Sequence, residues 1–142
     1  MNSEAAKDGA IRSLSNKDAK DFYVFKDGLS YAGVHLLIDM HGARNLNDIS
    51  AVENALKCSV LETGATLLNI DLHHFSQHGG ITGLAILAES HMSIHTWPET
   101  GFAAVDMFTC GECNAYKAVP VLKEHFHPNV LQVIEHKRGL VV

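Results

Sequence analysis

The chain has 142 residues, of which 46% are hydrophobic and 19% are charged, and its formal net charge is -5. This length suits one domain that can bury a sizeable core. Scattered basic residues on an acidic chain argue against a nucleic-acid partner, and no apolar run approaches the roughly 20 residues that cross a bilayer, so no membrane partner is expected.

Residues 1–22 are polar and aperiodic, so we expect a flexible N-terminal extension before a single domain over residues 23–142. The extension lacks the apolar core and small-residue cleavage site of a signal peptide, which favours a cytoplasmic location. Three cysteines, an odd number, indicate free thiols in a reducing compartment rather than a disulfide framework.

The first predicted elements are a strand and a helix. Val34–Asp39 is a short apolar run that ends at a turn, which is typical of a buried strand. Asn47 or Ser50 can cap the helix that follows, and Gly64 can end it. The apolar stripe of this helix consists of Ile49, Val52, Leu56 and Val60.

The centre of the chain is rich in predicted strands. Thr66–His73 alternates between apolar and polar side chains, which predicts a half-buried strand, and His78–Gly80 predicts a turn. The apolar side of this strand consists of Leu68, Ile70 and Leu72. Further strands are predicted at Ile81–Ala88, His91–Thr96 and Phe102–Phe108.

The chain ends with a second predicted helix and a last strand. Asn114–His125 has a helical pattern, in which Pro120 fits only in the first turn or at a kink, and Asn129–His136 reads as a strand. The element order predicts an α/β (α+β) two-layer sandwich, with a mainly antiparallel or mixed sheet and helices on one face. Because such a sheet leaves its other face uncovered, we expect a homo-oligomer.

The densest group of reactive side chains lies in Glu89–Glu99. Alternate side chains of a strand share a face, so His91, Ser93 and His95 project together, away from the core. A polar strand face that is simply exposed to water would give the same pattern, because a strand histidine is more often structural than catalytic.

Three reactive arrangements stay open on the residue pattern alone. Cys110 and Cys113 with His91 and His95 have the ligand types of a tetrahedral zinc site. The same Cys-x-x-Cys pair precedes a predicted helix and could carry redox chemistry of the thioredoxin type. Ser90 or Cys110 could also act as a nucleophile, with His95 as its base.

Two segments, Leu87–Glu99 and Ala103–Gly111, resemble the short prokaryotic S-adenosylmethionine decarboxylase proenzyme. The resemblance covers about residues 30–142. It continues through Gly33–Asp39, Asp71–Phe75, Tyr116–Leu122 and Lys137–Gly139.

This resemblance implies a chain that cuts itself between Glu89 and Ser90. Ser90 attacks the carbonyl of Glu89, and Thr82 assists this step. His95 then removes the Ser90 α-proton, so that the ester is eliminated. Ser90 is left as a covalent pyruvoyl group, the implied cofactor, which forms a Schiff base with the substrate amine and accepts electrons as carbon dioxide leaves.

The resemblance also assigns roles in the later chemistry. Cys110 becomes the acid that returns a proton to the substrate α-carbon. For the substrate S-adenosylmethionine, Glu99 holds the ribose hydroxyls and Phe75 stacks on the adenine, and Trp97 is a further candidate substrate-binding residue. Cys113 has no counterpart in this chemistry, and no metal is implied.

The implied product is decarboxylated S-adenosylmethionine, the aminopropyl donor for spermidine biosynthesis. The implied partners are the two cleavage products, a β chain of residues 1–89 and an α chain of residues 90–142, and a second copy in a homodimer whose active sites lie near the subunit boundary. Two alternatives stay open: a pyruvoyl-dependent decarboxylase of arginine or ornithine, and a zinc or redox module at Cys110 and Cys113.

Overall fold

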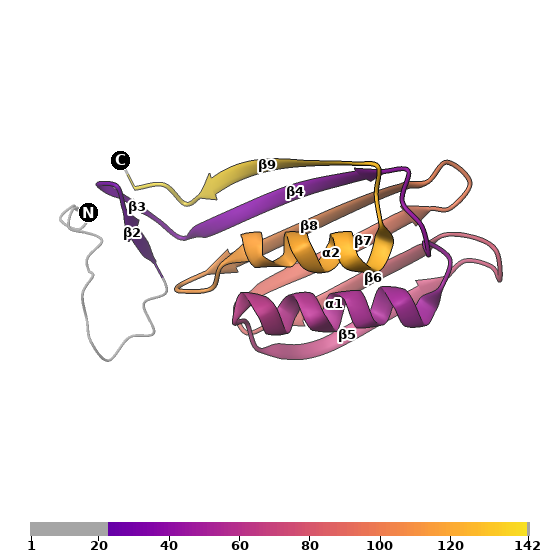
Figure 1. The fold of residues 1–142 in the computed structure, drawn as a ribbon. Helices are drawn as coiled ribbons and strands as arrows, with labels where there is room; N and C mark the ends of the chain where they lie inside the picture. The colour runs from indigo at the N-terminus through magenta and orange to yellow at the C-terminus, as the bar shows by residue number, and fades with distance from the viewer. Residues whose placement is uncertain (1–22, 142) are drawn as a thin grey trace.

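The computed structural model describes residues 23–141. The extension predicted for residues 1–22 lies outside the described residues. The described part has two main layers, a sheet and a pair of helices that cover one face of that sheet (Figure 1). The predicted α+β two-layer sandwich is confirmed.

The main sheet has six strands in the order β5-β6-β7-β8-β4-β9. Every neighbouring pair is antiparallel, so of the two predicted sheet types the antiparallel one is found. A separate hairpin, β2 (Val24–Lys26) and β3 (Leu29–Tyr31), precedes it. The six strands are β4 (Gly33–His41), β5 (Leu67–His74), β6 (Ile81–Leu87), β7 (Ser90–Trp97), β8 (Phe102–Cys110) and β9 (Val130–Arg138).

The helix layer consists of α1 (Ile49–Thr63) and α2 (Ala118–Phe126), which follows a short 3-10 turn, η2 (Ala115–Lys117). α1 ends at Gly64 with φ of 84°, as predicted. Pro120 lies in the first turn of α2, where its missing N–H leaves no intrahelical bond unmade. Between the layers lies a buried core that includes Leu36, Ile38, Met40, Val52, Leu56, Met92, Ile94, Met107, Leu122 and Phe126.

The start of α1 differs from the prediction. Asp48 caps the helix, instead of Asn47 or Ser50, because its extended backbone (φ −100°) lets Oδ1 accept a hydrogen bond from the Ala51 N–H at 3.1 Å. Ile49 does not join the buried stripe. As the first residue of the helix it stays 38% exposed.

The apolar side of β5 also differs from the prediction. Ile70 and Leu72 pack against the core as expected, but Leu68 is 63% exposed. The pairing of β5 with β6 is irregular between Leu67 and Asn69, and this bulge takes Leu68 out of the alternation.

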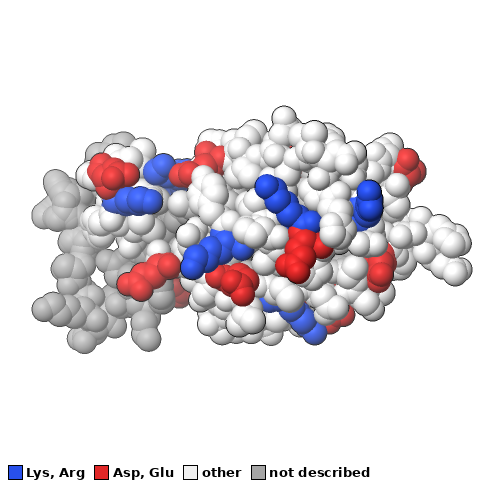
Figure 2. Space-filling view, in the orientation of Figure 1, with Lys and Arg blue, Asp and Glu red and all other residues white. Residues whose placement is uncertain are grey.

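The outer surface of the helix layer carries charged side chains of both signs, which are interspersed (Figure 2). One pair lies within α1, where Lys57 Nζ is 2.9 Å from Glu53 Oε2. None of the helices in residues 23–141 is long and apolar enough to cross a membrane. The other face of the sheet, called the open face below, has no helix on it within the described part of the chain.

Candidate active site

The β6–β7 hairpin holds the predicted cleavage site. Leu87 pairs with Ser90, so Ala88 and Glu89 form a two-residue loop. Glu89 has φ of 76°, a left-handed conformation that costs a residue with a β-carbon roughly 1–2 kcal/mol. The Ala88 N–H donates to the Thr66 carbonyl at 2.9 Å. The peptide bond between Glu89 and Ser90 therefore lies in a strained and anchored turn.

A thiol contacts this turn from the next strand of the sheet. Cys110 is the last residue of β8, and its Sγ donates to the carbonyl oxygen of Glu89 at 3.4 Å. Burial is the main cause that raises the pKa of Cys110 above its ordinary value, and the nearby Glu89 and Cys113 side chains raise it further. The thiol is therefore protonated at neutral pH.

Thr82 and His95 form a pair on the open face. They are cross-strand neighbours on β6 and β7, with 3.1 Å between Thr82 Oγ1 and His95 Nδ1. His95 lies five positions after Ser90 on β7, and at a rise of about 3.3 Å per residue this spans about 16 Å. The imidazole of His95 is therefore far from the Ser90 of its own chain.

The predicted substrate-binding residues lie at the end of the sheet opposite to the cleavage turn. Phe75 follows β5, and its exposed ring lies edge-on to His73 with 4.5 Å between the ring centroids. Trp97 is the last residue of β7, and its ring lies 5.2 Å from that of Phe102. Glu99 follows in the turn that leads to β8.

The predicted site residues therefore fall into two groups at opposite ends of the sheet. The cleavage group consists of Glu89, Ser90 and Cys110. The distal group consists of Phe75, Thr82, His95, Trp97 and Glu99. One copy of the chain brings together the predicted nucleophile and the predicted acid but keeps the predicted base apart from them.

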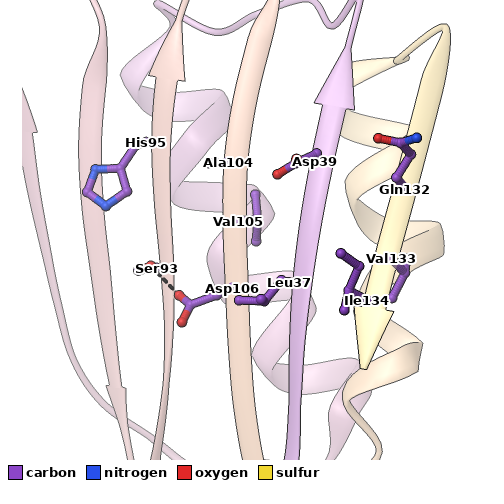
Figure 3. A pocket seen from close by; sticks show the side chains of 10 residues that line it. All are labelled: Leu37, Asp39, Ser93, His95, Ala104, Val105, Asp106, Gln132, Val133 and Ile134. Atoms are coloured by element: carbon purple, nitrogen blue, oxygen red, sulfur yellow. Dashed lines mark hydrogen bonds between the residues drawn. The ribbon is translucent and has the colours of Figure 1, made fainter. Parts of the chain in front are cut away.

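Between the two groups lies a histidine–aspartate network. The sequence analysis singled out His91 and Ser93 but missed their partners His35 and Asp106. Asp106 accepts hydrogen bonds from His35 Nε2 at 2.6 Å, from His91 Nε2 at 3.1 Å and from the Ser93 hydroxyl. Figure 3 shows the bond between Ser93 and Asp106 on the open face, with the helices behind the sheet. Burial opposes ionisation of Asp106, but the hydrogen bonds from Ser93, His35 and His91 outweigh it and lower the pKa of this carboxyl.

The predicted zinc ligands do not come together in residues 23–141. The group of possible metal ligands there is His35, His91 and Asp106, whose ligand atoms lie within 4.8 Å of one another, and it includes neither cysteine. Arg138 Nη1 donates to His35 Nδ1 at 3.0 Å, so Nε2 of His35 carries the proton that bonds Asp106. That nitrogen therefore offers no lone pair to a metal.

The fold is that of adenosylmethionine decarboxylases. The crystal structure of the adenosylmethionine decarboxylase from Aquifex aeolicus VF5 matches with a TM-score of 0.70 and 32% identity, over 79% of this chain and 94% of that one. The Trypanosoma brucei AdoMetDC-delta26 monomer matches with a TM-score of 0.54 and 22% identity, over 72% of this chain and 45% of that one, which is a likeness of fold alone.

Sequence comparisons identify the family. The family profile described as S-adenosylmethionine decarboxylase matches residues 34–139. Proteins named S-adenosylmethionine decarboxylase proenzyme from Thermomicrobium roseum and Methanococcus maripaludis strain C7 are 45% and 42% identical to this chain. These matches cover 78% and 77% of this chain, and 96% and 91% of the two relatives. The chain belongs to the S-adenosylmethionine decarboxylase family.

Proposed function

We propose that the protein is a self-processing S-adenosylmethionine decarboxylase, which cuts its own chain between Glu89 and Ser90 and then releases carbon dioxide from S-adenosylmethionine. The hydrogen bond from the Cys110 thiol to the Glu89 carbonyl carries this proposal, because it places a proton donor on the peptide that has to be cut. Family membership supports the same activity.

The geometry of the turn favours an acyl shift from nitrogen to oxygen. The Ser90 hydroxyl attacks the carbonyl carbon of Glu89, and the Cys110 thiol stabilises the negative charge that develops on the carbonyl oxygen. The left-handed backbone of Glu89 raises the energy of the uncut peptide, which lowers the remaining barrier. The ester that results needs a base that removes the Ser90 α-proton, and His95 is the proposed base.

Ser90 fits the position of a pyruvoyl precursor because it is partly exposed and follows the turn that Cys110 contacts. A pyruvoyl group at this position supplies an electron sink for decarboxylation. The raised pKa of Cys110 keeps its proton available for the substrate α-carbon once carbon dioxide has left.

The proposed base comes from a second copy of the chain. His95 lies about 16 Å along β7 from its own Ser90, whereas a general base acts within about 3 Å. When two sheets pack through their open faces with strands in opposite directions, the distal group of one copy lies over the cleavage group of the other. A homodimer with two shared sites follows.

The open face has apolar side chains that suit such a dimer. Leu37 on β4 pairs with Ile134 on β9, and the two side chains lie beside each other in Figure 3. They are 41% and 60% exposed. Leu84 and Ile86 on β6 are also exposed. The two apolar pairs lie on either side of Ser93 and Asp106. Exposed apolar side chains of this kind are typical of a protein–protein contact.

Replacing the nucleophile tests the cleavage. Ser90→Ala should give one uncut polypeptide without decarboxylase activity, whereas the wild type gives fragments of residues 1–89 and 90–142. Ser50→Ala, which alters an exposed serine of α1, should be cut like the wild type. Denaturing electrophoresis with intact mass measures cutting, and carbon dioxide release from S-adenosylmethionine, arginine and ornithine measures substrate choice. A fully cut Ser90→Ala chain would refute the proposal.

Co-expression of two inactive variants tests the shared site. His95→Ala and Ser90→Ala should each stay uncut when expressed alone. In a mixed dimer the His95→Ala chain presents its Ser90 to the intact His95 of the Ser90→Ala chain, so the His95→Ala chain should be cut. Different tags on the two chains identify the fragments. A purified mixed dimer that stays whole would contradict a base supplied by the second copy.

A further inference from the structure

Cys110 and Cys113 are held close together by a turn that the proposed mechanism does not need. Gly111 (φ 64°) and Glu112 form the turn, and the Cys113 N–H donates to the Cys110 carbonyl at 3.4 Å. The first and fourth Cα atoms of a β-turn lie within about 7 Å of each other. A disulfide joins Cα atoms that are about 4.4–6.8 Å apart. The backbone therefore already meets the spacing of a disulfide.

Both cysteines also border one hollow at the surface. Cys110 and Cys113 line it together with Glu89, and both are partly exposed free thiols. The third cysteine, Cys58, lies on α1 and borders a different hollow with Glu62. A small oxidant that enters the first hollow meets two thiols, whereas at Cys58 it meets one.

We propose that Cys110 and Cys113 are an oxidation site, at which a peroxide converts the two thiols into a reversible intramolecular disulfide. One thiolate attacks a peroxide oxygen, which gives a sulfenic acid and water. The second thiol then attacks that sulfur and releases a second water. In total, two thiols are oxidised to one disulfide and one hydrogen peroxide is reduced to two waters.

This disulfide removes the hydrogen that Cys110 donates to the Glu89 carbonyl. In the uncut chain the oxidised protein lacks that donor, so self-cleavage stops. In the cut protein the same sulfur has no proton for the product. This consequence rests on the proposed function, but formation of the disulfide does not.

The environment of the two thiols determines when the site reacts. Burial is the main cause that raises the pKa of both thiols. Glu89 and Cys113 raise the pKa of Cys110 further, and Glu112 raises that of Cys113 further. Because the thiolate is the reactive form, oxidation should be slow at neutral pH and should accelerate as the pH rises toward the raised pKa values of the two thiols.

The test treats the cut wild type, Cys113→Ser and Cys58→Ser with hydrogen peroxide. Wild type and Cys58→Ser should lose two hydrogen atoms in mass, with the cross-link mapped to the peptide that holds residues 110–113. Their decarboxylase activity should fall and return after reduction. Cys113→Ser should form no cross-link. Its activity should return less completely after reduction, because without a second thiol the sulfenic acid is left open to further oxidation to the irreversible sulfinic and sulfonic acids.

Thermal unfolding checks that Cys113→Ser is folded before treatment. No cross-link in the treated wild type, or one that includes Cys58, would overturn the proposal. Reduction that restores treated Cys113→Ser as fully as wild type would overturn it too. A mapped disulfide in a protein without decarboxylase activity would refute the proposed function and leave the oxidation site standing.

Discussion

Asp106 ties together three neighbouring strands of the open face. Its carboxylate on β8 accepts hydrogen bonds from His35 on β4 and from His91 and Ser93 on β7. The side chain is 21% exposed, so water screens these bonds only in part. The network therefore stabilises the sheet, and it also forms part of the surface between the two groups of site residues.

The pKa of Asp106 gives a pH-dependent prediction. Its folded value is lowered below the unfolded value of about 3.9, so its contribution to stability is complete above that pH and is lost as the pH falls through the folded pKa. Asp106→Asn should lower the free energy of unfolding at neutral pH by about 1–3 kcal/mol. The variant should also lose less stability than the wild type on acidification.

Urea denaturation between about pH 7 and pH 3 measures both effects. Asp71→Asn, on an exposed carboxylate of β5, is the matched control and should change little. Parallel acid profiles of Asp106→Asn and the wild type would show that the network contributes no pH-dependent stability.

Single residues were predictable only where their neighbours in the sequence identify them. Ser90 was singled out by the residues around it, whereas the bond between His35 and Asp106 joins positions 71 apart and exists only through the β4–β8 register. One signal was available, since Asp106 alternates with the buried Val105 and Met107 and must therefore lie on the open face.

At the scale of elements, the start of α1 depends on one side chain. Asp48 Oδ1 accepts from the Ala51 N–H, which otherwise has no partner within the helix. Asp48→Ala should therefore lower the free energy of unfolding by about 1 kcal/mol, as measured by urea denaturation. Asn47→Ala is the control, and an equal loss in both variants would contradict the assignment of the cap.

The strands were predictable because alternation and turn residues mark them, and all six predicted strands are found in the sheet. The start of α1 was not predictable from the sequence, since Asn47, Asp48 and Ser50 are all good capping residues. Only the backbone conformation determines which of them caps the helix. Leu68 was misplaced because a bulge interrupts the alternation and leaves no mark in the residue pattern.

At the scale of the whole molecule, the proposed dimer depends on the open face. Ile134→Lys puts a charge into an apolar part of the proposed contact, so we expect a monomer that no longer cuts itself. Leu61→Lys is the matched control, because Leu61 is 76% exposed on the helix side. Light scattering after size exclusion measures the mass. A dimeric, self-cutting Ile134→Lys protein would contradict this interface.

The order of the strands also has a consequence for the cut protein. The proposed cleavage after Glu89 would assign β4, β5 and β6 to the first fragment and β7, β8 and β9 to the second. In the sheet, β4 lies between β8 and β9, so the two fragments are interwoven and stay joined by backbone ladders. Once separated by denaturant, they can reassemble only through a bimolecular encounter. The proposed cleavage would thus make refolding concentration-dependent, and folding would have to be finished before the chain is cut.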